Sequence, residues 1–200
     1  MRDAVLRQQK ERLLTPIAQG LFAAVHPNVV SLAALAVGLS SAVAVVWQAC
    51  WLGLGLWLLN RMLDGLDGVI ARTHKKQSDF GGYLDLFLDY IVYLAAPIAF
   101  VVAVPTRANL WACTALFAAY YLNTMSWMGL SPLLAKRRRQ PGSRFTSLEM
   151  PTGLIEGTET VILYALFYIF APYSARLFLL MAILVCLTAA QRLWWAYRHL

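Results

Sequence analysis

The sequence predicts an all-α integral membrane protein with six transmembrane helices and an amphipathic helix at the membrane interface before them. Of its 200 residues, 60% are hydrophobic and only 14% are charged, whereas soluble domains carry about 25% charged residues. A soluble domain of this size could not bury so much apolar surface. The apolar residues also gather in six stretches, each close to the roughly 20 residues that a membrane helix needs. Composition therefore excludes a soluble globular enzyme and a disordered chain.

Each apolar stretch is bounded by residues that favour turns or helix starts. The expected spans are 28–49, 51–71, 82–104, 110–130, 152–169 and 174–195. Pro27 precedes the first span, and Pro105 follows the third. Pro151 precedes the fifth, where proline suits a first helical turn, and Pro172 follows it.

The segment before the first span is expected to be a separate amphipathic region, residues 1–26, ahead of a membrane domain at 27–200. Apolar residues such as Leu13 and Ile17 recur at helical spacing among charged ones such as Arg7 and Lys10. A helix of this kind lies in the membrane interface, with a plain cytosolic leader as the alternative. The segment has no continuous apolar core, so we expect no cleavable signal peptide.

The formal net charge of +7 is unevenly distributed along the chain. Lys and Arg gather before the first span, after the second, after the fourth and after the sixth, whereas the other connections contain only Arg107 and Arg176. By the positive-inside rule, both termini are expected to be cytoplasmic. The basic run at 136–139 fits contact with lipid headgroups. Nucleic acid is not an expected partner, since no aromatic interleaving or reader module accompanies the charge.

Four aspartates are placed to form one metal site. Asp64 and Asp67 lie three residues apart near the end of the second span, and Asp85 and Asp89 lie four apart near the start of the third. Each pair shares a helix face, and a short polar loop makes the two helices antiparallel neighbours. Four converging carboxylates repel one another unless cations are present, and oxygen-rich sites suit divalent cations such as Mg²⁺ or Mn²⁺. Neutralisation by Arg and Lys is the structural alternative.

Small residues and an arginine surround these aspartates. Gly68 and Gly81 allow a ligand to approach the backbone closely, and Ala71 continues the small surface. Arg72 can bind a phosphate through two parallel hydrogen bonds. Together with cations, these residues predict a pyrophosphate site that faces the cytoplasm.

The spacing of these residues resembles the signature of the CDP-alcohol phosphatidyltransferase family, D-x2-D-G-x2-A-R-x8-G-x3-D-x3-D. Every defined position matches: Asp64, Asp67, Gly68, Ala71, Arg72, Gly81, Asp85 and Asp89. The length, the six expected spans and the amphipathic leader also agree with that family.

The resemblance implies a reaction in phospholipid biosynthesis. Such enzymes transfer a substituted phosphate from a CDP-alcohol, commonly CDP-diacylglycerol, to a second alcohol and release CMP. They use two divalent cations, Mg²⁺ or Mn²⁺, and form homodimers. The resemblance assigns Asp64, Asp67, Asp85 and Asp89 to the metals and makes Asp89 also the base for the acceptor hydroxyl. It assigns to the CDP-alcohol the residues Asn28, Ser31, Gly68, Ala71, Arg72, Ser78 and Gly81.

A second acidic cluster bears on the acceptor. Glu156 and Glu159 lie three residues apart in the fifth expected span, and Arg61 lies one turn before Asp64. Either the arginine pairs with a glutamate and braces two helices, or the three residues form an acceptor pocket. Acidic residues suit an amino alcohol or polyol. The stretch Ser78-x-Phe80-Gly81, followed by Asp89 and Pro97, is similar to bacterial phosphatidylserine synthases and favours serine. A phosphorylated acceptor, such as glycerol phosphate or inositol phosphate, is the alternative within the same reaction.

A divalent-cation transporter is the alternative from another functional class. The carboxylates could act as ion ligands, but transporters commonly contain internal repeats or broken helices, and none is visible here. Release of CMP from CDP-diacylglycerol distinguishes the two functions.

Overall fold

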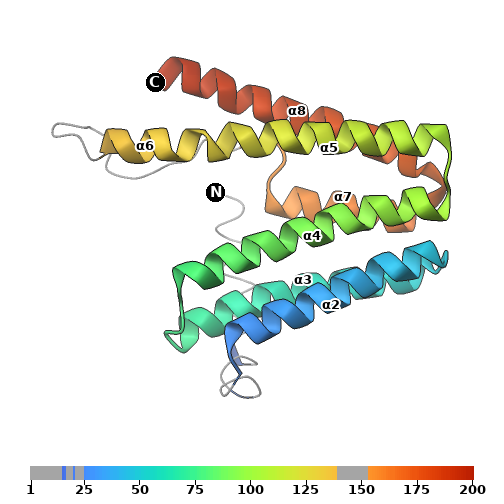
Figure 1. Ribbon diagram of the computed structural model, residues 1–200, viewed down its shortest axis with the longest axis horizontal. Helices are drawn as coiled ribbons and strands as arrows, with labels where there is room; N and C mark the ends of the chain where they lie inside the picture. The colour runs from blue at the N-terminus through green and yellow to red at the C-terminus, as the bar shows by residue number, and fades with distance from the viewer. Residues whose placement is uncertain (1–14, 17–19, 21–24, 139–152) are drawn as a thin grey trace.

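The computed structural model describes residues 15–16, 20, 25–138 and 153–200, and the secondary structure that it contains there is helical. The long helices run side by side as an elongated bundle (Figure 1). This confirms the predicted all-α class. The amphipathic helix expected within residues 1–26, and most of the basic run at 136–139, lie outside the residues whose side chains are described.

Three helices form one layer of the bundle: α2 (Pro27–Val46), α3 (Cys50–Thr73) and α4 (Asp79–Ala103). Short connections make them antiparallel neighbours, and α2 packs against both α3 and α4 (Figure 1). Gly38 permits the close approach of α2 and α4, because a Cβ atom there would lie 2.7 Å from Cγ2 of Val92. Small residues serve this purpose where membrane helices meet.

The second layer contains α5 (Arg107–Met128), α6 (Leu130–Arg138) and α8 (Ser174–His199). Helix α8 runs along α5, and α7 (Gly157–Ile169) lies between the two layers (Figure 1). A short 3-10 turn, η1 (Ala171–Tyr173), joins α7 to α8.

Aromatic side chains join the two layers in the core. Trp57 of α3 is fully buried and stacks on Tyr164 of α7, with ring centroids 5.0 Å apart. Phe167 of α7 meets Phe178 of α8 edge to face at 4.8 Å. Pairs of this kind add to the stabilisation from burial alone, so α7 fixes the position of α3 relative to α8.

Three helical segments in the described part of the chain are long and apolar enough to cross a membrane: α2, α4 and the segment Ala171–His199. Helices α3 and α5 have comparable lengths, 24 and 22 residues, and α7 is a shorter apolar helix of 13 residues. The structure therefore supports several spans, and the count of six stays a prediction. Five of the six expected spans coincide with helices whose ends differ from the expected ones by at most four residues.

The fifth span begins later than predicted. We expected a helix from residue 152, whereas α7 begins at Gly157. The preceding backbone bonds sideways to α8: the amide of Ile155 donates to Oγ1 of Thr188, and the amide of Leu154 donates to Oε1 of Gln191, both at 3.0 Å. These hydrogen bonds hold the segment before α7 outside any helix.

Candidate functional site

Three helix ends meet at one end of the first layer: the start of α2, the end of α3 and the start of α4 (Figure 1). Proline at the first turn of α2 and the His26 side chain, which accepts from the amide of Asn28 at 3.3 Å, begin that helix. Ser78 caps α4 by accepting from the amide of Gly81 at 3.0 Å. Serine is among the preferred residues at this position.

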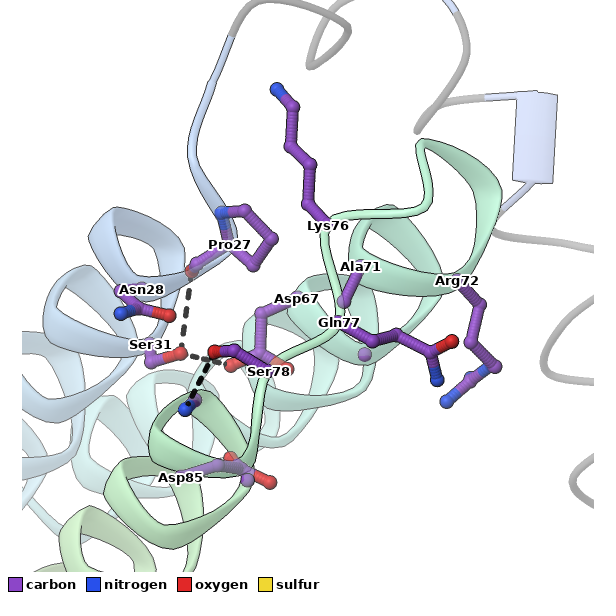
Figure 2. A pocket seen from close by; sticks show the side chains of 13 residues that line it. Pro27, Asn28, Ser31, Asp67, Ala71, Arg72, Lys76, Gln77, Ser78 and Asp85 are labelled. Atoms are coloured by element: carbon purple, nitrogen blue, oxygen red, sulfur yellow. Dashed lines mark hydrogen bonds between the residues drawn. The ribbon is translucent and has the colours of Figure 1, made fainter.

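A cavity of about 200 Å³ opens between these helix ends (Figure 2). All seven residues assigned to the CDP-alcohol line it: Asn28, Ser31, Gly68, Ala71, Arg72, Ser78 and Gly81. Three further polar or small residues line it that were not predicted from the sequence: Lys76, Gln77 and Gly82. Lys76 and Gln77 occupy undefined positions of the signature. They could have been predicted only from the expectation that the loop joining α3 to α4 lies beside the cavity.

The signature glycines Gly68 and Gly81 leave space for polar side-chain atoms at the cavity wall. A Cβ atom at Gly81 would lie 3.0 Å from Oγ of Ser78 and 3.3 Å from Oδ1 of Asn28. At Gly68 it would lie 3.3 Å from Nη1 of Arg72, whose side chain extends back over the glycine. Glycine at both positions therefore keeps the wall open to a ligand.

All four aspartates surround two adjoining cavities. Asp67 and Asp85 line the cavity described above. Asp64, Asp85 and Asp89 line a smaller hollow between α2, α3 and α4, so that Asp85 faces both. The structure therefore brings the four carboxylates to neighbouring positions but divides them between two cavities, and their role as one metal site stays a prediction.

The aspartates make specific contacts with their neighbours. Ser31 of α2, assigned to the CDP-alcohol, donates a hydrogen bond to Asp67. Nη2 of Arg61 donates to Oδ1 of Asp89 at 2.8 Å, and Nη1 lies 3.9 Å from Oδ2 of Asp64.

The donor set is suitable for divalent cations. Within the described ranges, no three side chains of Asp, Glu, His or Cys are gathered closely enough to enclose an ion. Carboxylate oxygens from two facing helices, with a serine hydroxyl beside them, are nevertheless the hard donors that Mg²⁺ and Mn²⁺ take. The residues present therefore fit the metals that the sequence implied.

The second acidic cluster has a structural role at the start of α7. Glu156 is the N-cap, and its carboxylate accepts from the amide of Gly153 at 3.0 Å. The Glu159 carboxylate accepts from the amide of Glu156 at 3.2 Å, which completes a capping box. The expected brace between Arg61 and a glutamate is wrong, because the ion-pair partners of Arg61 are Asp64 and Asp89.

Comparison with known proteins gives a family match over most of the chain. The family model of CDP-alcohol phosphatidyltransferase matches residues 24–190. The inner membrane protein YnjF of Escherichia coli K12 is 37% identical over 142 residues, which cover 70% of this chain and 68% of that protein.

Other relatives match shorter regions. A bifunctional IPC transferase and DIPP synthase of Archaeoglobus fulgidus is 36% identical over 44% of this chain and 18% of its own length. A phosphatidylcholine synthase of Pseudomonas aeruginosa is 43% identical over 27% of this chain and 23% of its own length. This chain therefore matches only a minor part of either enzyme.

Solved structures share the fold. Phosphatidylinositol phosphate synthase (PgsA1) of Mycobacterium tuberculosis with CDP-DAG bound superposes with a TM-score of 0.64 at 22% identity, covering 91% of this chain and 92% of that one. The same enzyme in complex with manganese and citrate gives a TM-score of 0.66 at 20% identity, with coverages of 92% and 88%.

Proposed function

Because the chain belongs to the CDP-alcohol phosphatidyltransferase family, we propose that it transfers the phosphatidyl group of CDP-diacylglycerol to the hydroxyl of a second alcohol and releases CMP. One observation carries this proposal: the seven residues assigned to the CDP-alcohol line a single cavity, and all four signature aspartates border it or the adjoining hollow. A divalent-cation transporter would require the carboxylates but would not require a cavity for a nucleotide.

The donor's nucleotide would lie in the cavity between α2, α3 and α4. Arg72 supplies a guanidinium at the cavity wall, and Lys76 adds a second cation. Both suit the negative charge of a pyrophosphate. Gly81 and Gly68 admit the phosphates close to the backbone. The M. tuberculosis enzyme with CDP-DAG bound supports this choice of donor.

Two divalent cations, Mg²⁺ or Mn²⁺, would be held by Asp64, Asp67, Asp85 and Asp89. Bound there, they would neutralise negative charge on the pyrophosphate and on the departing CMP. The related structure in complex with manganese supports this assignment. Ser31 orients Asp67 by hydrogen bonding, which holds this ligand in place from α2.

Asp89 would act as the general base. As the acceptor oxygen forms a bond to the donor phosphorus next to the lipid, the bond from that phosphorus to the CMP oxygen breaks, and the acceptor proton passes to the Asp89 carboxylate. Asp89 suits this role because it lines the smaller hollow, one turn deeper along α4 than Asp85. A positioned base contributes about 10² to 10⁴-fold to the rate.

We propose a small unphosphorylated alcohol, such as serine or another amino alcohol or polyol, as the acceptor. The acceptor-side candidates are Arg61, Glu156 and Glu159. Arg61 already pairs with two aspartates, and both glutamates are negative, so these three residues offer little positive charge to an acceptor phosphate. The enzymes named above differ in their products, since one is a phosphatidylcholine synthase and another a phosphatidylinositol phosphate synthase.

A screen of acceptors with the purified protein tests the reaction and the acceptor together. We expect CMP release from CDP-diacylglycerol, with a new lipid of the corresponding mass, when serine, an amino alcohol or a polyol is supplied. Glycerol phosphate and inositol phosphate are expected to support much slower turnover. Robust turnover with either phosphate would refute the acceptor assignment and leave the reaction class intact. The absence of CMP release with every acceptor would refute the enzymatic proposal.

The chain would be a multi-pass protein of the bacterial inner membrane, with this site on the cytoplasmic side. The apolar helices and the E. coli inner membrane relative support the membrane location. The charge asymmetry supports the orientation, since the α3–α4 connection carries Lys75 and Lys76 beside the cavity.

Cysteine labelling tests that orientation. In a protein whose native cysteines are replaced by alanine, we expect Lys75→Cys and Thr106→Cys to react from opposite sides of the membrane. Both native residues are exposed and lie in connections at the two ends of α4. Labelling of both from the same side by an impermeant maleimide would overturn the topology.

A further inference from the structure

Arg61 is a buried cation in the middle of α3. Its exposed fraction is only 8%, although it lies within α3, one turn before Asp64. Buried charges at membrane depth are costly and are kept where they have a function. The contacts that surround the guanidinium indicate which function this is.

The guanidinium is held by two aromatic rings and by side-chain hydrogen bonds. Trp57 and Tyr93 lie over it, each with its ring centroid 5.0 Å from Cζ. Nε donates to Oδ1 of Asn60 at 2.7 Å, and Nη1 donates to the hydroxyl of Tyr93 at 3.1 Å. Contact with aromatic rings combined with several directional donors distinguishes arginine from lysine.

The residues that hold Arg61 are themselves held by other helices. Nδ2 of Asn60 donates to the carbonyl of Ala34 in α2 at 2.7 Å, and this orients its oxygen toward Arg61. The hydroxyl of Tyr164 in α7 donates to the carbonyl of Tyr93 at 2.7 Å. Elements from α2, α3, α4 and α7 therefore fix the guanidinium before any substrate binds.

The remaining edge of the guanidinium meets Asp89. Nη2 donates to Oδ1 of that carboxylate at 2.8 Å, a charge-assisted hydrogen bond, which is stronger than a neutral one. Asp89 would otherwise be free to rotate about its side-chain torsions, and a base is efficient only when its oxygen points at the proton that it takes.

We infer that Arg61 is a positioning residue, which is held rigidly by Trp57, Asn60 and Tyr93 and orients the Asp89 carboxylate toward the acceptor hydroxyl. The inference rests on the proposed function, in which Asp89 is the base. It gives Arg61 an indirect role toward the acceptor. A direct role would need the guanidinium to leave the aromatic rings and the asparagine that fix it.

The test compares Arg61→Lys with Tyr93→Phe and with the matched control Arg107→Lys. Lysine keeps the charge but cannot meet Asn60, Tyr93 and Asp89 at once. Phenylalanine keeps the ring at position 93 but removes the hydroxyl that fixes Nη1. Arg107 is the first residue of α5, is exposed and lies far from both cavities. Its replacement by lysine therefore shows the effect of an arginine-to-lysine substitution outside the site.

We expect Arg61→Lys to lower kcat by about 10²-fold, the lower end of the range for a positioned base. Tyr93→Phe should lower kcat by a smaller factor, and Arg107→Lys should leave it unchanged. The KM for the acceptor and the affinity for CDP-diacylglycerol, measured by calorimetry, should change much less than kcat in all three. The Tm of each variant in detergent identifies any loss of folded protein, and kcat is expressed per folded molecule.

A double-mutant cycle with Asp89→Asn decides whether Arg61 acts through Asp89. If it does, adding Arg61→Lys to Asp89→Asn causes little further loss, because the group that it positions is gone. Losses that multiply would overturn the inference. A raised acceptor KM with kcat preserved would assign Arg61 to acceptor binding instead, and a lowered Tm with kcat preserved would make it a structural residue. Absence of CMP release by the wild-type protein would instead contradict the proposed function.

Discussion

Replacing Asp85 with asparagine is expected to reduce CMP release below detection while leaving the protein folded. Asp85 lines both the nucleotide cavity and the smaller hollow, so it is placed to contact both proposed cations. The amide removes a negative charge where two divalent ions must be held. The loss of activity should be larger than that caused by removing a hydrogen-bond partner of a metal ligand, which is about 10- to 100-fold. CMP release over a titration of Mg²⁺ and Mn²⁺ measures it, and Asp64→Asn should behave similarly.

Asp79→Asn is the matched control. It removes the same charge from the first turn of the same helix, but Asp79 is exposed and lies outside both cavities. We expect it to retain activity and metal dependence. Wild-type turnover in excess chelator, or an Asp85→Asn variant that is as active as Asp79→Asn, would contradict the two-metal proposal.

Replacing Asp89 with asparagine is expected to lower turnover by about 10² to 10⁴-fold, the contribution of a positioned general base. Asparagine keeps the shape and one oxygen but cannot take the acceptor proton. Binding of CDP-diacylglycerol should change far less, because Asp89 lines the smaller hollow and not the nucleotide cavity. Single-turnover CMP release and calorimetric donor binding measure the two effects separately.

Asp67→Asn serves as the comparison for Asp89→Asn. Asp67 lines the nucleotide cavity and hydrogen-bonds to Ser31, so we expect its replacement to weaken metal-dependent donor binding as well as turnover. If Asp89→Asn binds donor normally and turns over within about tenfold of the wild-type rate, its loss is below the general-base range and the base lies elsewhere.

The sequence was sufficient to predict the helical class, five of the six helix positions and most of the residues that line the larger cavity. The physical reason is that these features follow from local periodicity and fixed spacing. Asp64 and Asp67 share a face of one helix, Asp85 and Asp89 share a face of the next, and a five-residue connection between Thr73 and Asp79 holds these faces together. Lining residues such as Lys76 depend on the path of that loop, which spacing alone does not determine.

The structure also contains features that no local pattern indicates. Hydropathy does not distinguish a helix from a non-helical apolar segment, so it could not predict that α7 begins late. The late start is explained by hydrogen bonds from the preceding backbone to Thr188 and Gln191 in α8. The partners of Arg61 depend on which helices pack around it. Its neighbour in space is Asp89, 28 residues away in the chain, whereas the sequence suggested the glutamates of the fifth span.

The shortness of α7 has a consequence for the surrounding membrane. Thirteen helical residues extend only about 20 Å, less than the roughly 30 Å thickness of bilayer hydrocarbon. The amide of Ile155, just before the N-cap of α7, bonds to α8 at Thr188, eleven residues before the end of α8 at His199, or about 16 Å by helix rise. Asp89 lies ten residues inside α4, about 15 Å from its start.

Partly buried carboxyl groups and non-helical backbone at such a depth require hydration or protein cover. In the proposed membrane orientation, we expect the bilayer beside α7 to be thinned or hydrated on the side on which the carboxylates lie. A polar alcohol would then reach Asp89 through water, while the acyl chains of the donor remain in the hydrocarbon of the bilayer. The short helix α7 would thus bring the membrane–water interface to the depth at which the two substrates react.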